Sequence, residues 1–271
     1  MMIRDTLVFD IETVADAESA RRLLGCPELS DIQARDALAK YFRDKTDGKN
    51  DFPRQPFHQV VAISYVHLLH ERDTHGSQWI LKRIASGGVA ETSEKELLEG
   101  FFHLIETRTP QLVSFNGRSF DMPVLKYRAM RHGLSCPRWF SAGDRWNNYE
   151  SRYSSVYHLD LLEVLSDYGA SARCSMDEVA AVFEIPGKLE VAGSDVRRLF
   201  ESGDISAIRH YCEMDVCTTL LIFLRWQLFQ GILNDVAYAQ LLQSLRNYLN
   251  AEREEKPHFM RFLEAWDEGM S

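Results

Sequence analysis

The chain has 271 residues, of which 45% are hydrophobic and 26% are charged, a size and balance that suit one sizeable globular domain. Its formal net charge of −9 argues against tight, extended binding to duplex nucleic acid, although metal ions can offset a few phosphate charges locally. No apolar run approaches the ~18 residues of a membrane span, and the five cysteines include no CxxC pair, so we expect a soluble, cytoplasmic protein with reduced thiols.

A strand and a long polar segment open the chain. The apolar residues of 6–13 predict a buried strand. The segment 16–51 is polar with scattered leucines, which favours a helical insertion with a turn at 47–50. Two further strands are expected at 59–66 and 78–81, and three early strands indicate a meander.

Helices and strands then alternate. Ser93 and Glu96 have the spacing of a capping box, and an apolar stripe with helical period follows them. Pro110 ends this helix, and residues 111–115 form the next strand. A helix is expected from Asp121 up to a glycine cap at position 133. This order predicts a mixed α/β sheet.

The last part of the chain has three predicted regions. Residues 136–157 lack periodicity and form a surface loop, 158–162 re-enter the core, and the remainder is helical. We therefore expect an α/β domain over 1–234 and a helical C-terminal extension over 235–271 that packs on it. The aromatic residues of the loop fit either a base-stacking platform or ordinary packing, which is the simpler interpretation: Trp139, Phe140, Trp146, Tyr149, Tyr153 and Tyr157.

Two acids stand near the end of the first strand. Asp10 and Glu12 are two residues apart, so their side chains point to the same face of the strand. Carboxylates held so close repel each other unless a cation lies between them, which favours a site for a hard metal. The alternative is a strand that runs into a polar loop.

Two later stretches carry similar residues. Asn116 and Gly117 supply a turn after a strand, and Asp121 falls at the start of a helix, where a carboxylate also fits a plain helix cap. Tyr211 and Asp215 are four apart on a predicted helix and share a face. In isolation, that second pattern also fits an amphipathic helix with a buried tyrosine.

In combination, the three stretches are more specific. Asp10-Ile11-Glu12, then Asn116 to Asp121, then Tyr211 to Asp215 resemble the three motifs of the DEDD exonucleases with a tyrosine in the third motif. The resemblance is closest to the proofreading exonuclease domain of family B DNA polymerases and its stand-alone bacterial relatives. It spans residues 10–215, and the remaining sequence has no room for a polymerase domain.

The resemblance implies a ribonuclease H-like fold and a two-metal active site. Asp10, Glu12, Asp121 and Asp215 match the acids that bind two divalent cations, for which oxygen ligands favour Mg²⁺ or Mn²⁺. Tyr211 matches the tyrosine that orients the attacking water, and a phenol with a pKa of about 10 is a poor base at neutral pH. Further candidates lie within the motifs and would contact the terminal nucleotide: Thr13, Asn116 and Phe120. Phe120 would do so by stacking, and packing in the core is an equal alternative for it.

The implied function is a 3′–5′ exonuclease that releases nucleoside monophosphates from single-stranded DNA ends. An exoribonuclease of short RNAs is the alternative within the class, because the motifs do not touch the 2′-position. A catalytically silent binding module is the alternative outside it, and the complete set of acids argues against that. We interpret Asp160 as a structural residue or one that supports the metal ligands, and not as a fifth ligand. We interpret the scattered cations either as phosphate contacts or as a solvated surface: Arg118, Lys188, Arg197 and Arg198.

Overall fold

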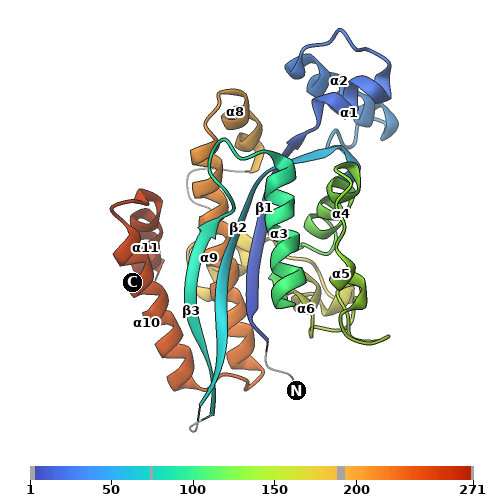
Figure 1. Ribbon diagram of the computed structural model, residues 1–271. Helices are drawn as coiled ribbons and strands as arrows, with labels where there is room; N and C mark the ends of the chain where they lie inside the picture. The colour runs from blue at the N-terminus through green and yellow to red at the C-terminus, as the bar shows by residue number, and fades with distance from the viewer. Residues whose placement is uncertain (1–3, 74–75, 188–192, 270–271) are drawn as a thin grey trace.

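The computed structural model describes residues 4–73, 76–187 and 193–269. A five-stranded sheet in the order β3-β2-β1-β4-β5 forms its centre (Figure 1). β2 runs antiparallel to β1 and β3, whereas β4 is parallel to β1 and β5 is parallel to β4. The predicted mixed α/β class is confirmed. The strands are β1 Thr6–Ala15, β2 His58–Asp73, β3 Gly76–Ser86, β4 Gln111–Ser114 and β5 His158–Asp160.

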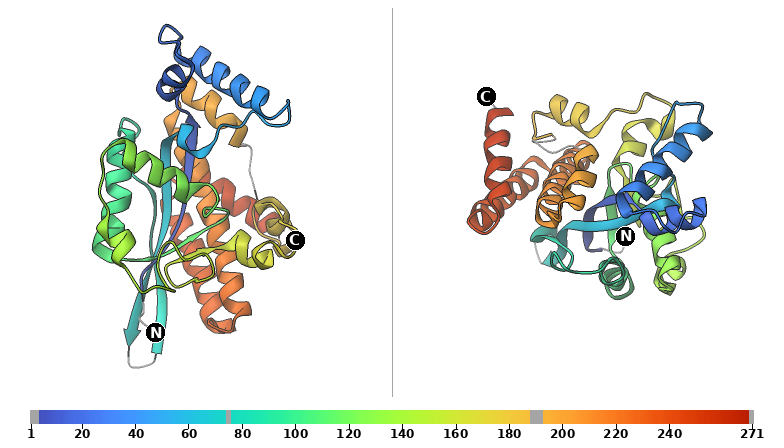
Figure 2. Two further views of the ribbon diagram at one scale, coloured as in Figure 1. Left: turned by 90° about the vertical axis from the view of Figure 1, so that its right-hand side faces the viewer. Right: turned by 90° about the horizontal axis from the view of Figure 1, so that it is seen from above.

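Helices cover both faces of the sheet (Figures 1 and 2). Leu7, Phe9 and Ile11 of β1 pack toward α3, α4 and α5, whereas Val8 packs toward α9, as expected for alternating side chains. The even-numbered residues of β1 therefore face α9. The helices are α1 Ala17–Leu24, α2 Asp31–Lys45, α3 Glu94–Arg108, α4 Asp121–Arg131, α5 Pro137–Ser141, α6 Leu161–Leu165, α7 Met176–Phe183, α8 Val196–Glu201, α9 Ile205–Phe229, α10 Asp235–Glu252 and α11 Pro257–Gly269.

The hairpin of β2 and β3 is longer than expected from the sequence. Strands were predicted at 59–66 and 78–81, and both are confirmed as parts of β2 and β3. The ladder continues through His67, His70 and Glu71, which interrupt the apolar pattern. Backbone hydrogen bonds between paired strands do not require apolar side chains, so hydrophobic periodicity missed this end of the hairpin.

Two local predictions concern helix ends. The capping box is present, because Ser93 Oγ accepts from Glu96 N and the Glu96 side chain accepts from Ser93 N. The helix ends at Arg108, one residue before a left-handed Thr109 and two before Pro110.

The loop expected at 136–157 contains one short helix, α5, so that interpretation was wrong over its first residues.

Two groups of helices flank the central layers. α1 and α2 lie beyond the end of β1 (Figure 2) and share a small core that includes Ala20, Leu38 and Phe42. α10 and α11 pack beside α9 and β3, where Leu245, Phe262 and other apolar residues join the core of that face. Within the described ranges, no helix is both long and apolar enough to cross a membrane.

Candidate active site

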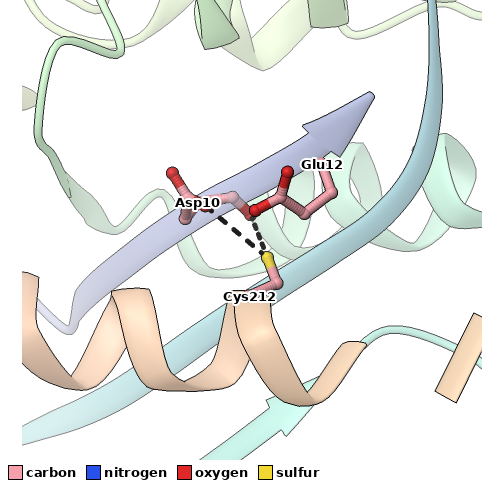
Figure 3. Close-up of side chains that lie close together, drawn as sticks. All are labelled: Asp10, Glu12 and Cys212. Atoms are coloured by element: carbon pink, nitrogen blue, oxygen red, sulfur yellow. Dashed lines mark hydrogen bonds between the residues drawn. The ribbon is translucent and has the colours of Figure 1, made fainter. Parts of the chain in front are cut away.

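The two acids of β1 lie on the face that α9 covers. Asp10 and Glu12 share the orientation of Val8, and Glu12 is buried whereas Asp10 is half-buried. Figure 3 shows both side chains close to the thiol of Cys212 on α9. A ligand atom from each of the three residues lies within 4.8 Å of the other two. Among the described residues, this is the group of His, Cys, Asp and Glu side chains whose ligand atoms lie close enough together to hold one metal ion.

Asp121, on α4, is hydrogen-bonded to the strand that carries Asp10 and Glu12. It is the first residue of α4, and the backbone N–H of Ile11, between Asp10 and Glu12, donates to its Oδ1 at 3.3 Å. Burial raises the pKa of Asp121 to about 7, and the charge of Asp160 adds to the rise, while hydrogen bonds from backbone N–H groups oppose it.

The turn before α4 allows this approach. Asn116 has a positive φ of 67°, which its short polar side chain tolerates. A Cβ at Gly117 would lie 2.3 Å from Ser114 Oγ and 3.5 Å from Asp121 Oδ2, so a larger residue would displace the turn. The Asn-Gly pair thus holds the start of α4 against the sheet.

α9 supplies the third stretch. Tyr211 and Asp215 are both buried, one helical turn apart. Burial raises the pKa of Tyr211 far above its usual range, and the charges of Asp215, Glu12 and Asp10 raise it further. A hydrogen bond with Asp215 acts in the same direction. The structure therefore brings the phenol and the acids of the first and third stretches into one buried site.

Cys212 is a residue of this site that the sequence interpretation missed. Its Sγ lies 3.5 Å from the carbonyl oxygen of Asp10 and 3.7 Å from Asp10 Oδ2. Burial and the charges of Asp10 and Glu12 raise the pKa of the thiol well above its usual range, so it stays protonated. A usable signal was its position three residues before Asp215, on the same face of the helix.

The three residues expected to bind the terminal nucleotide lie in different surroundings. Thr13 Oγ1 is 2.9 Å from His58 Nδ1, and the ring of His58 stands edge-on to that of Phe120 with centroids 4.9 Å apart. The ring of Phe52 lies 5.7 Å from Phe120 and is 57% exposed. Thr13 and Phe120 are therefore joined through His58, next to an open aromatic ring that sequence reasoning did not find.

The side chain of Asn116 is held locally. Its Oδ1 accepts from Ser119 Oγ at 2.5 Å, and its backbone N–H donates to Asp160 Oδ1 at 2.9 Å. Asp160 also accepts from the backbone of Arg118 and caps α6 through Leu162 N. These bonds support the structural interpretation of Asp160, which organises the turn that carries Asn116.

The scattered cations have carboxylate or interior partners. Arg118 lies 3.0 Å from His158 Nδ1 and 3.5 Å from the carbonyl oxygen of Glu150, so it braces the turn from inside. Arg197 pairs with Asp36 and Glu201, and Arg198 pairs with Asp195. The prediction for Lys188 lies outside the described residues.

The aromatic residues of 136–157 divide into two sets. Trp139, Tyr149 and Tyr157 are buried, and the rings of the first two stack with centroids 5.2 Å apart. This set packs in the core, as the simpler interpretation expected. The second set has exposed rings that the packing interpretation does not explain: Phe140, Trp146 and Tyr153.

The fold and the acids on β1 fit the exonuclease class that the three motifs resemble. Residues 50–266 match the family of predicted 3′–5′ exonucleases related to the exonuclease domain of PolB, and the chain belongs to this family. It is therefore an enzyme of the class related to polymerase proofreading domains. The matched range contains Asp121, Tyr211 and Asp215, whereas Asp10 and Glu12 precede it.

The chain is similar to parts of two polymerases. The catalytic polypeptide of DNA polymerase epsilon from Dictyostelium discoideum is 41% identical over 71 residues, which is 26% of this chain and 3% of that polymerase. The solved structure of the family B DNA polymerase from the hyperthermophilic archaeon Pyrobaculum calidifontis superposes with a TM-score of 0.47 and 18% identity. That superposition covers 94% of this chain and 30% of the archaeal polymerase.

Proposed function

We propose that this protein is a metal-dependent 3′–5′ exonuclease that hydrolyses the phosphodiester bond at the 3′ end of single-stranded DNA and releases nucleoside monophosphates. The observation that carries the proposal is that Asp10 and Glu12 of β1 lie against α9 beside Tyr211 and Asp215, with Asp121 hydrogen-bonded to the strand between the first two acids. Family membership supports the direction of cleavage, and the relation of the family to the exonuclease domain of PolB favours a DNA end as substrate.

The acids fit a pair of divalent cations. Asp10, Glu12, Asp121 and Asp215 would hold Mg²⁺ or Mn²⁺, which prefer oxygen ligands. The raised pKa of Asp121 supports this fit, because a nearby cation would offset the cost of ionising a buried carboxylate. When bound, the two cations supply positive charge that acidifies water and stabilises the leaving 3′-oxygen.

Tyr211 positions the attacking water through hydrogen bonds in the proposed mechanism. Its buried phenol stays protonated at neutral pH, because burial and the charges of the neighbouring acids raise its pKa. A protonated phenol cannot remove a proton from water, but its oxygen can accept a hydrogen bond from the attacking water and so orient it. Asp215 receives a hydrogen bond from the phenol and so sets its direction.

The terminal nucleotide would lie beside the ring cluster of Phe120, His58 and Phe52. Aromatic faces stack on any base, which suits an exonuclease that must accept every terminal nucleotide. Thr13, whose hydroxyl is oriented by His58, and Asn116 would contact the sugar or the phosphate. The exposed ring of Phe52 extends the surface on which a base can stack.

The direct test uses single-stranded DNA and RNA of equal sequence and length, labelled at the 5′ end. We expect the DNA to shorten one nucleotide at a time from its 3′ end with Mg²⁺ or Mn²⁺, and to stay intact with chelator. Asp215→Asn should abolish cleavage, while Asp235→Asn, an equal change on the exposed start of α10, should not. Intact DNA in both metals would refute the proposal, and faster loss of RNA would reassign the substrate.

A further inference from the structure

A buried carboxylate lies between the two functional residues of α9. Glu213 is 4% exposed and stands two residues after Tyr211 and two before Asp215. Two residues correspond to about 200° of rotation on an α-helix, so Glu213 points away from the side that carries the other two. Its hydrogen bonds reach the end of β3 and the junction of α10 and α11.

Four hydrogen bonds reach the Glu213 carboxylate from β3, from the turn between α10 and α11, and from α11. Its Oε1 accepts from the backbone N–H and the hydroxyl of Ser86 on β3, both at 2.9 Å. Its Oε2 accepts from Lys256 Nζ at 3.0 Å and from His258 Nε2 at 2.9 Å. We call Glu213, Lys256, His258 and Ser86 the Glu213 cluster. Each oxygen is thus held by a different part of the fold.

The Glu213 cluster extends to β2, the strand beside the one that carries Asp10 and Glu12. The Ser86 hydroxyl lies 2.8 Å from the hydroxyl of Ser64, which is the residue of β2 paired with Asp10 in the sheet register. Lys256 Nζ also donates to the carbonyl oxygen of Ile84 on β3 at 3.2 Å. A continuous hydrogen-bonded path therefore runs from the C-terminal helices through α9 and β3 to the position opposite Asp10.

The cluster is charged, and its members cannot move independently. Burial raises the pKa of Glu213, but the hydrogen bond from His258 and the charge of Lys256 lower it to about 2. The ring of His258 stacks on that of His210 of α9, with centroids 4.1 Å apart and planes 17° apart. A buried ion that loses its partner is strongly disfavoured, so α9 cannot rotate or slide without breaking costly contacts.

We propose that Lys256 and His258 are positioning residues for the reaction: through Glu213 they hold α9 so that Tyr211 and Asp215 meet the acids of β1. This inference rests on the proposed function and deepens it. It gives the C-terminal helices a part in catalysis without contact to the substrate. Partners that orient metal ligands typically change metal affinity or activity by about 10–100-fold when removed.

The test compares two cation-to-methionine changes in the C-terminal helices. Lys256→Met removes one partner of Glu213, whereas Arg246→Met breaks a 2.6 Å ion pair with Asp267 that joins α10 to α11. For Lys256→Met we expect Mn²⁺ affinity, measured by electron paramagnetic resonance, and kcat each to fall about tenfold, with the KM for a DNA oligonucleotide nearly unchanged. Arg246→Met should leave all three values unchanged.

Two further variants separate positioning from folding. Lys256→Arg keeps the charge and should restore most of the Mn²⁺ affinity. If Lys256→Met does not fold, His258→Phe removes the other donor while keeping an aromatic ring beside His210, and the same loss of Mn²⁺ affinity is expected. A folded Lys256→Met or His258→Phe protein with unchanged Mn²⁺ affinity and kcat would overturn the inference.

The readouts also distinguish this inference from the proposed function. Mn²⁺ affinity is measured without any substrate, so a wild-type protein that binds Mn²⁺ but leaves DNA and RNA intact would refute the exonuclease proposal alone. The effect of Lys256→Met on metal affinity would still decide whether the Glu213 cluster positions α9. A wild-type protein that binds no Mn²⁺ would overturn both.

Discussion

Two carboxylates in this protein are equally buried and behave in opposite ways. Asp121 and Glu213 are each 4% exposed. Burial and the charge of Asp160 raise the pKa of Asp121 to about 7, whereas His258 and Lys256 outweigh the burial of Glu213 and bring its pKa to about 2. The same desolvation cost therefore has different outcomes, set by the sign of the neighbouring charges.

The difference separates an acid with a structural role from one suited to function. Lys256 and His258 donate to ionised Glu213 and stabilise it, and the C-terminal segment that carries them is thereby tied to α9. Asp121 meets backbone N–H groups and a second carboxylate, so a bound cation would stabilise its ionised form. Strongly perturbed groups of this second kind are typical of functional sites.

Replacement of Asp121 should have the largest effect on activity. If its carboxylate holds a catalytic cation, Asp121→Asn should slow 3′-end cleavage about 10³-fold, equivalent to about 4 kcal/mol. The metal-free variant should be as stable as the wild type or more stable, because a buried acid has been removed. Single-turnover cleavage and urea unfolding without metal measure the two quantities. Full activity would remove Asp121 from the site.

Replacement of Glu213 should lower the stability of the metal-free protein, the opposite of the effect expected for Asp121. Glu213→Gln leaves the buried His258 and the partly exposed Lys256 without their anion, and this should cost about 3 kcal/mol, the lower end of the range for a broken buried pair. Urea unfolding without metal should show this loss at neutral pH. A variant as stable as the wild type would mean that the Glu213 carboxylate does not stabilise the fold, and the contrast with Asp121 would be wrong.

Replacement of Tyr211 should have the next largest effect, and this effect should be confined to the rate of cleavage. Tyr211→Phe keeps the buried ring and loses the hydroxyl that orients water, so we expect cleavage to slow about 10²-fold. Because the phenol is not among the expected metal ligands, Mn²⁺ affinity should stay within about twofold of the wild type. Isothermal titration of Mn²⁺ beside a cleavage assay separates the two. Unchanged cleavage would exclude the tyrosine from the mechanism.

Asp16 offers a third buried carboxylate with a smaller expected effect. Burial raises its pKa, but hydrogen bonds from Ser19 and from Arg128, at 2.6 Å, lower it below 3.8 overall. A depressed folded-state pKa stabilises the fold above the unfolded value, and the gain is lost as pH falls through the folded value. We expect wild-type stability to drop below pH 4 by about 1 kcal/mol more than that of Asp16→Asn. Chemical denaturation at pH 3 and pH 6 measures the difference.

Local pattern predicted much of the site. The strand with Asp10 and Glu12, the turn at Asn116 and the helix start at Asp121 each follow from side-chain period or turn chemistry that operates over a few residues. The full length of the hairpin did not follow, because its outer ladder depends on backbone pairing between two segments. The exposure of Trp146 and Tyr153 also depends on packing that no local pattern encodes.

The sequence by itself determined the order of the motifs, the helical spacing of Tyr211 and Asp215, and the mixed α/β class. These features follow from patterns that extend over only a few residues of the chain. Only the tertiary structure decided that Cys212 lies against Asp10, 202 residues away, and that Glu213 takes its partners from positions 86, 256 and 258. The physical reason is that helical period shows which side of α9 a residue occupies, whereas the packing of α9 between the sheet and the C-terminal helices decides what each side meets.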